Sequence, residues 1–82
     1  MSLTNQKIIL EAKIADLQRQ QVSTDYEADM FLATLLTLAD PATDKCGDFD
    51  PDKIEHAADG FIRNIRKFKT LQTEIDRLTK LL

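Results

Sequence analysis

The chain is poor in the residues from which chemical sites are most often built. Its 82 residues include one cysteine, one histidine, two glycines, two prolines and no tryptophan. A single cysteine cannot form a disulfide within the chain, and with one histidine it cannot supply the four ligands of a structural zinc site. The two glycines lie at positions 47 and 60, too far apart for a glycine-rich phosphate-binding loop. Disulfide scaffolds, zinc domains within one chain and such loops are therefore excluded.

Long apolar runs are also missing. The longest uninterrupted runs, such as 30–33, are only a few residues long, whereas a helix that spans a bilayer needs about 20 apolar residues. The first residues show no basic segment followed by an apolar run, so no secretory signal is expected. One unpaired cysteine suits a reducing compartment. We therefore expect a cytoplasmic protein that does not enter the membrane.

The length allows one domain over residues 1–82. A chain of this size buries only about 60–65% of the surface that its unfolded form exposes. Without a disulfide or a metal, the usual support for so small a core is a partner chain. Association is therefore expected from size alone.

The strongest pattern lies between Ile54 and Leu82. Its apolar residues recur at steps of three, four and seven, as on one stripe of a helix: Ile54, Ala58, Phe61, Ile65, Phe68, Ile75 and Leu82. Asp50 is a good N-cap and Pro51 suits the first helical position. The pattern predicts a helix over about 51–82 whose stripe forms the core.

Residues 3–39 carry a second helical pattern. Alternating steps of four and three select Leu3, Lys7, Leu10, Ile14, Leu17, Gln21, Thr24, Ala28, Phe31, Leu35 and Leu38, eight of which are apolar. Thr24 is followed by Glu27, a possible capping box, so the chain could form one helix or two helices broken near Ser23. One helix is preferred because its length of about 54 Å is similar to the length of the predicted second helix, about 48 Å.

Asp40 and Pro41 are expected to end the first helix, because proline disfavours helix at the residue before it. Residues 40–50 then form an acidic turn. Folding back there brings Leu38 near 51–54, Phe31 near 58–61, Leu17 near Gln72 and Leu10 near 78–82. The expected fold is all-α, a long antiparallel helical hairpin.

Nine apolar residues lie off both stripes: Ile8, Ile9, Val22, Met30, Leu32, Leu36, Ile62, Leu71 and Leu78. Two helices cannot bury a second apolar face, so another helix layer is implied. We expect two hairpins to pair into a four-helix bundle. The expected apolar contacts to the partner are Leu32, Leu36, Ile62 and Leu71.

Charge is unevenly distributed along the chain. Residues 25–55 hold nine acidic and two basic side chains, whereas residues 56–82 hold six basic and three acidic ones. The predicted second helix also carries a basic cluster, formed by Arg63, Arg66, Lys67 and Lys69. An antiparallel homodimer would place each acidic half against a basic half, so this orientation is expected. The basic cluster is a further candidate for binding a partner protein.

The candidates for catalysis or metal binding are weak. Asp48, Asp50 and Asp52 have the spacing of the first ligands of an EF-hand, but Lys53 and Asp59 stand where that loop needs glycine and glutamate. Cys46 lies between acidic residues, which disfavour a reactive thiolate. We expect no catalytic residue, no metal and no cofactor.

The sequence therefore predicts a non-enzymatic structural or adaptor protein, which acts through coiled-coil self-association or by docking on a partner protein. The alternative is a small regulator or accessory protein of a nucleic-acid machine, possibly encoded by a phage or plasmid, that uses the basic cluster. The acidic net charge of −3 disfavours direct contact with nucleic acid.

Overall fold

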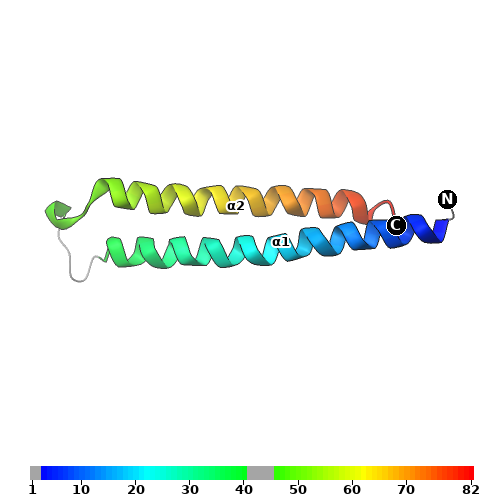
Figure 1. Ribbon diagram of the computed structural model, residues 1–82. Coiled ribbons are helices and arrows are strands. Elements are labelled where there is room, and N and C mark those ends of the chain that lie inside the picture. The colour runs from blue at the N-terminus through cyan, green and yellow to red at the C-terminus, as the bar shows by residue number, and fades with distance from the viewer. Residues whose placement is uncertain (1–2, 41–45) are drawn as a thin grey trace.

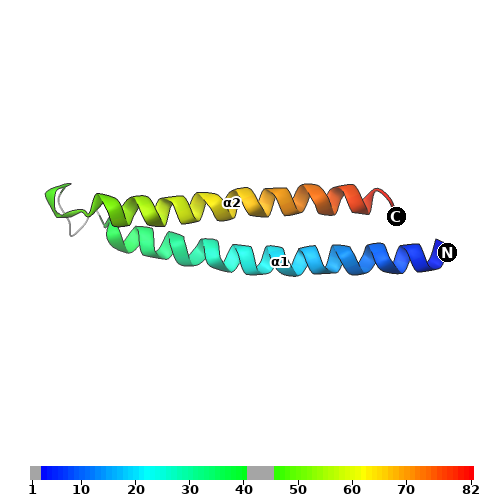
Figure 2. The same cartoon turned by 45° about the horizontal axis from the view of Figure 1, so that its top comes forward.

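The computed structural model describes residues 3–40 and 46–82. Two long helices, α1 (Leu3–Leu38) and α2 (Pro51–Thr79), are joined by a connection that contains a short 3₁₀ helix, η1 (Cys46–Asp48). The two long helices lie side by side and run in opposite directions (Figures 1 and 2). They form a rod with extents of 65 × 16 × 14 Å. The predicted all-α hairpin is confirmed, while residues 41–45 of the predicted turn lie outside the described residues.

Helix α1 is continuous from Leu3 to Leu38, so the prediction of one helix is confirmed over that of two helices. Thr24 lies in the interior of α1 and is only 2% exposed. Its hydroxyl donates a 2.7 Å hydrogen bond to the carbonyl of Gln20. A buried hydroxyl needs a partner, and the preceding turn of the same helix supplies one. Thr24 therefore does not act as a cap, and the chain does not break near Ser23.

Helix α2 begins as predicted. The Asp50 carboxylate accepts hydrogen bonds from the backbone N–H groups of Asp52, at 3.0 Å, and Lys53, at 3.2 Å, and Pro51 is the first helical residue. The helix ends at Thr79, earlier than the predicted 82. Beyond Lys80 the backbone bonds span three residues instead of four, with the Leu81 N–H donating to the Leu78 carbonyl at 3.0 Å and the Leu82 N–H to the Thr79 carbonyl at 3.1 Å, a tightening that is common at helix ends.

Replacing Asp50 with alanine is expected to lower the free energy of unfolding by about 1 kcal/mol, because two backbone N–H groups lose their acceptor. Urea denaturation followed by circular dichroism measures the change. Asparagine at this position is the control, since its side chain also caps helices well. Equal stability of the Asp50→Ala variant and the parent chain would contradict the capping role.

The side of α1 that contacts α2 is the one predicted. Gln21, Thr24 and Ala28 are buried, and six apolar positions of the same stripe are half-buried: Leu10, Ile14, Leu17, Phe31, Leu35 and Leu38. The register agrees with the prediction where Phe31 meets Gly60, whereas Gln72, predicted near Leu17, bonds to Gln21 one helical turn away. Gln21 Nε2 donates a 2.9 Å hydrogen bond to Gln72 Oε1 from the opposite helix, and Phe31 packs over Gly60.

The contact side of α2 agrees with the predicted stripe at Ile75 and differs from it at other positions: Leu82 is 54% exposed, and Leu78, predicted to lie off the stripe, is buried. Its buried residues are Ala57, Gly60, Asn64, Leu71, Ile75 and Leu78. Ile65 and Phe68, predicted to lie in the core, are 37% and 36% exposed. Leu71, predicted to contact a partner chain, is buried inside the hairpin, and this assignment is corrected accordingly.

The displacement of the α2 stripe has a physical cause. Ala57, Gly60 and Asn64 lie where the helices meet, and none of them is a large apolar residue. Asn64 can be buried because its Nδ2 donates a 2.8 Å hydrogen bond to the Gly60 carbonyl. Gly60 leaves room for the ring of Phe31, which a Cβ atom would overlap. A search for large apolar residues therefore selects the neighbouring positions.

Candidate interaction surface

Large apolar side chains remain on the outside of the hairpin. On α1, Val22 is 72% exposed, Tyr26 68% and Leu36 64%. Ile8 and Met30 on α1 and Ile62 on α2 are exposed as well. A helix with apolar residues on most of its sides is typical of one that is covered on more than one side. Within the described residues, neither helix contains an apolar stretch long enough to cross a membrane.

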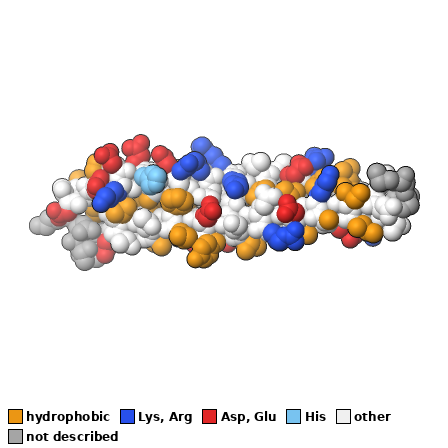
Figure 3. All heavy atoms as spheres, in the orientation of Figure 1, with side chains coloured by type: hydrophobic (Ala, Val, Ile, Leu, Met, Phe, Trp, Pro, Cys, Tyr) orange, Lys and Arg blue, Asp and Glu red, His pale blue; other side chains and the backbone are white. Residues whose placement is uncertain are grey.

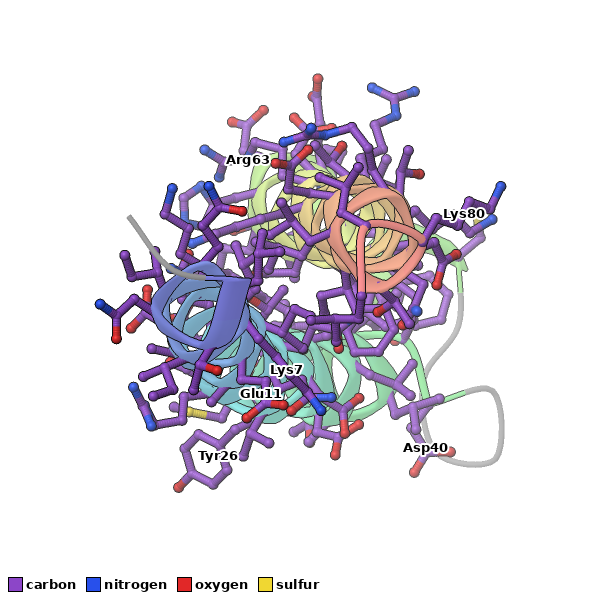
Figure 4. The ribbon with its side chains drawn as sticks, turned by 90° about the vertical axis from the view of Figure 1, so that its right-hand side faces the viewer. Lys7, Glu11, Tyr26, Asp40, Arg63 and Lys80 are labelled. Atoms are coloured by element: carbon purple, nitrogen blue, oxygen red, sulfur yellow. The ribbon has the colours of Figure 1, made fainter. Side chains whose placement is uncertain are left out.

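Many of these side chains follow one line along α1, which we call the outer stripe. Alternating steps of four and three residues define it as Ile8, Ala12, Ala15, Arg19, Val22, Tyr26, Asp29, Ala33 and Leu36. Ala15 is half-buried and the other eight are exposed. Tyr26 lies two residues, or about 200° of helix rotation, from the buried Thr24 and Ala28. Its ring accordingly points away from α2 (Figure 4).

The contact residues predicted from the sequence lie partly on this surface. Leu36 belongs to the outer stripe, and the half-buried Leu32 lies beside it on α1. Ile62 is 42% exposed on α2. The prediction omits Tyr26, Arg19 and Asp29, although the second four-and-three pattern from Ile8 to Leu36 contains them.

An open hollow lies between the helices on one flank of the rod. Asp25 and Ala28 of α1 line it together with Ile65, Phe68 and Lys69 of α2. Its floor is apolar, and its two charged side chains have opposite signs. Ile65 and Phe68 are half-exposed because they border this hollow rather than fill the core.

The basic cluster lies exposed on α2. Arg63, Arg66, Lys67 and Lys69 are all exposed, and Arg63 Nε donates a 3.4 Å hydrogen bond to the Asp59 carbonyl. In the described parts of the chain, the ion pairs join residues of the same helix and leave the basic cluster out: Lys7 with Glu11, Arg19 with Asp16, and Arg77 with Glu74. On the face in Figure 3, acidic side chains gather toward the turn end of α2 and basic ones nearer the middle.

One charged pair shifts the ionisation of its members. Arg77 hydrogen-bonds the Glu74 carboxylate, with Nε at 3.0 Å from Oε2, and this contact lowers the pKa of Glu74, as does the nearby charge of Lys13. The same contact raises the pKa of Arg77. The stability that Glu74 contributes is therefore present above its ordinary pKa and is lost as the pH falls through the lowered value. Because both side chains reach solvent, this contribution is small.

Among the described residues near the turn, Cys46, His56 and Asp50 are placed as follows. Cys46 is an exposed free thiol in η1. The His56 ring packs edge-on against Phe31, with the ring centroids 6.4 Å apart. The Asp50 carboxylate serves as the cap of α2. Across residues 3–40 and 46–82, no three histidine, cysteine, aspartate or glutamate side chains are grouped as metal ligands.

Comparison with known proteins finds no matching family model, no similar curated protein and no similar solved structure. The exposed side chains described above make the apolar surface of the hairpin, with the charges that border it, the candidate site.

Proposed function

We propose that the chain is a non-enzymatic structural or adaptor protein that works through helix–helix association, with a second copy of itself as the partner. The supporting observation is the exposure of Val22, Tyr26 and Leu36 on a helix whose opposite side is already packed. Fully burying one large apolar side chain contributes about 1.5–3 kcal/mol. Extended apolar surfaces on small proteins commonly mark contact sites. The cytoplasm remains the expected location.

The distribution of charge supports an antiparallel dimer. Residues 25–55 carry a net charge of −7 and residues 56–82 a net charge of +3. Side-by-side parallel rods would bring the two acidic ends together, whereas antiparallel rods bring each acidic end toward a basic region. Single surface ion pairs contribute only about 0–1 kcal/mol, so charge selects the orientation while apolar burial supplies affinity. The proposed assembly has four helices and a two-fold axis, with Leu32, Leu36 and Ile62 at or beside the contact.

Self-association is tested by measuring mass across a range of concentrations with light scattering or sedimentation. We expect a dimer, and we expect Leu36→Glu to raise its dissociation constant at least tenfold, because burying the new carboxylate costs more than about 1.4 kcal/mol. Leu36 is exposed in the single hairpin, so the variant should keep its helical content. Thr70→Glu adds the same charge on α2 and serves as the control. A parent chain that stays monomeric at high concentration would contradict the proposal.

A second function is supported by the basic cluster. Its four side chains are exposed and take no part in the ion pairs found among the described residues. They are suited to an acidic surface, which could belong to a protein or to a nucleic-acid machine. Fluorescence anisotropy with mixed DNA and RNA oligonucleotides at low salt tests the direct form of this role. Absence of binding in the micromolar range would remove it.

A further inference from the structure

The outer stripe of α1 is complementary to itself when two copies run in opposite directions. We infer that the second copy docks on this stripe, α1 against α1, with the two-fold axis at the level of Thr24. The inference rests on the proposed self-association and specifies the surface and register of contact. It differs from the sequence-based expectation because α2 takes no part in the central contact.

The charged residues of the stripe support this register. Arg19 and Asp29 are the only charged members of the outer stripe, and they have opposite signs. In an antiparallel pair of helices, facing positions have residue numbers with a constant sum. A sum of 48, as for 19 and 29, places Arg19 opposite the partner's Asp29. By symmetry it also places Asp29 opposite the partner's Arg19. The interface therefore contains two ion pairs, and each of the four charges has a partner of opposite sign.

Six of the seven apolar members of the stripe face one another in the same register, and Ile8 lies beyond the last pair, at the level of the partner's Asp40 past the end of α1. Val22 faces the partner's Tyr26 beside the axis, so the most exposed large side chains cover each other. Further out, Ala15 faces the partner's Ala33, and Ala12 faces the partner's Leu36. A large side chain opposite a small one, or two small ones, lets helices approach closely and pack without voids. Leu32 lies beside the stripe and can extend the contact.

Other arrangements of the same stripe place charge against apolar side chains. A shift of one heptad in one direction sets Arg19 against the partner's Val22 and Asp29 against the partner's Ala12. The opposite shift sets Arg19 against the partner's Leu36 and Asp29 against the partner's Tyr26. A parallel pair sets Arg19 against the partner's Arg19. Unpaired or like charges at a contact are strongly disfavoured, so the stripe selects one orientation and one register.

Arg19 is free to make this contact in the assembled dimer. Its guanidinium lies 3.6 Å from the Asp16 carboxylate of the same helix, and both side chains are largely exposed. Exposed pairs at this spacing contribute little, and a guanidinium has donors for two carboxylates. One feature opposes the contact, because Asp25 lies beside the axis and approaches the partner's Asp25. Lys69, of opposite charge, lines the same hollow as Asp25.

Charge reversal tests the register. Arg19→Glu alone and Asp29→Arg alone should each raise the dissociation constant of the homodimer at least about tenfold, since like charges then face each other. An equimolar mixture of these two variants should form a heterodimer within about threefold of the parent affinity, because each new pair is again of opposite sign. The controls are Lys53→Glu and Asp59→Arg on α2, outside both the outer stripe and the basic cluster, which should leave the affinity unchanged. Circular dichroism checks that every variant keeps its helices.

Spin-label distances test the geometry independently. Leu38 lies fourteen residues beyond Thr24 in α1, so labels on Cys46, past the end of this helix, should be more than about 40 Å apart. In a Cys46→Ser background, labels on Ser23→Cys should lie within about 20 Å, because position 23 is one residue from the axis. Short distances at both sites would mean a parallel dimer and would overturn the inference.

Failure of the proposed self-association and failure of the inferred contact give different results. A parent chain that remains monomeric contradicts both the proposed self-association and the inferred contact. A stable dimer whose affinity is insensitive to Arg19→Glu and Asp29→Arg overturns only the contact, and points to another face. Loss of dimer with Arg66→Glu instead would assign the contact to the basic cluster on α2. Weakening of the homodimer by Asp29→Arg is the result that a general effect of net charge cannot produce, because this substitution changes the net charge of −3 by +2 and so lowers the repulsion between copies.

Discussion

Replacing Leu71 with alanine is expected to lower the free energy of unfolding by about 2–4 kcal/mol, the usual range for a buried leucine. Leu71 is 9% exposed and lies on the side of α2 that faces α1. The substitution removes apolar burial and leaves a cavity between two helices that have no third layer within the hairpin to close it. Urea denaturation at a fixed protein concentration measures the effect, since association also contributes to apparent stability.

Two further alanine variants make the comparison specific. Leu81→Ala removes the same side chain where it is exposed, and should change stability by less than about 1 kcal/mol. Ile65→Ala tests the stripe that the sequence pattern predicts, and should cost less than Leu71→Ala because Ile65 is half-exposed. A larger loss at Ile65 than at Leu71 would show that α2 presents the predicted stripe to α1 after all.

The second large effect concerns Phe31 and Gly60. Phe31→Ala should lower the free energy of unfolding by about 2–4 kcal/mol, because the ring fills the space above Gly60 and contacts His56. Gly60→Ala should also destabilise, by about 1–2 kcal/mol. The added methyl group overlaps the ring, and the cost of overpacking exceeds the gain of up to about 1 kcal/mol in helix propensity.

The effect of Gly60→Ala should change sign when Phe31 is already alanine. With the ring removed, the three atoms nearest the added methyl group are gone, and the gain in helix propensity should then outweigh the remaining cost. A double-mutant cycle measured by urea denaturation gives the coupling directly. Gly60→Ala that stabilises the parent chain would show that the Phe31 ring moves aside without cost, and that the close approach of the helices at this point is not required.

Local rules explain what the sequence predicts correctly. The four-and-three spacing identifies the buried side of α1, and the Asp50 and Pro51 pair identifies the start of α2. The position of the turn then determines the register, since two helices of similar length that meet at one end can align in few ways. The contact of Phe31 with Gly60 follows from this register, whereas Gln72 bonds to Gln21, one helical turn from the predicted Leu17.

The contact side of α2 could not be predicted by the same rules. Helices approach most closely where side chains are small, so Ala57 and Gly60 occupy contact positions that an apolar search passes over. Asn64 is buried because its amide bonds to its own helix, which sequence spacing alone does not reveal. The error at Leu71 follows directly, since a stripe placed one position away leaves it outside.

The interaction surface is predictable only in part for a related reason. Leu32 and Leu36 appear as surplus apolar residues once one side of α1 is assigned to the core. Arg19 and Asp29 do not, because charged residues are first read as solvent-exposed. Their complementary positions become clear only when the outer stripe is aligned with a second copy of itself that runs in the opposite direction.

Side chains in the middle of the contact between α1 and α2 also oppose sliding of one helix along the other. Gln21 is bonded to Gln72, and Phe31 fits only over Gly60. If one helix slid along the other by a heptad, about 10.5 Å, the glutamine pair would separate and the phenylalanine would meet Lys53 or Lys67 in place of glycine. A slide by one heptad is therefore disfavoured, and the rod is expected to keep a constant length.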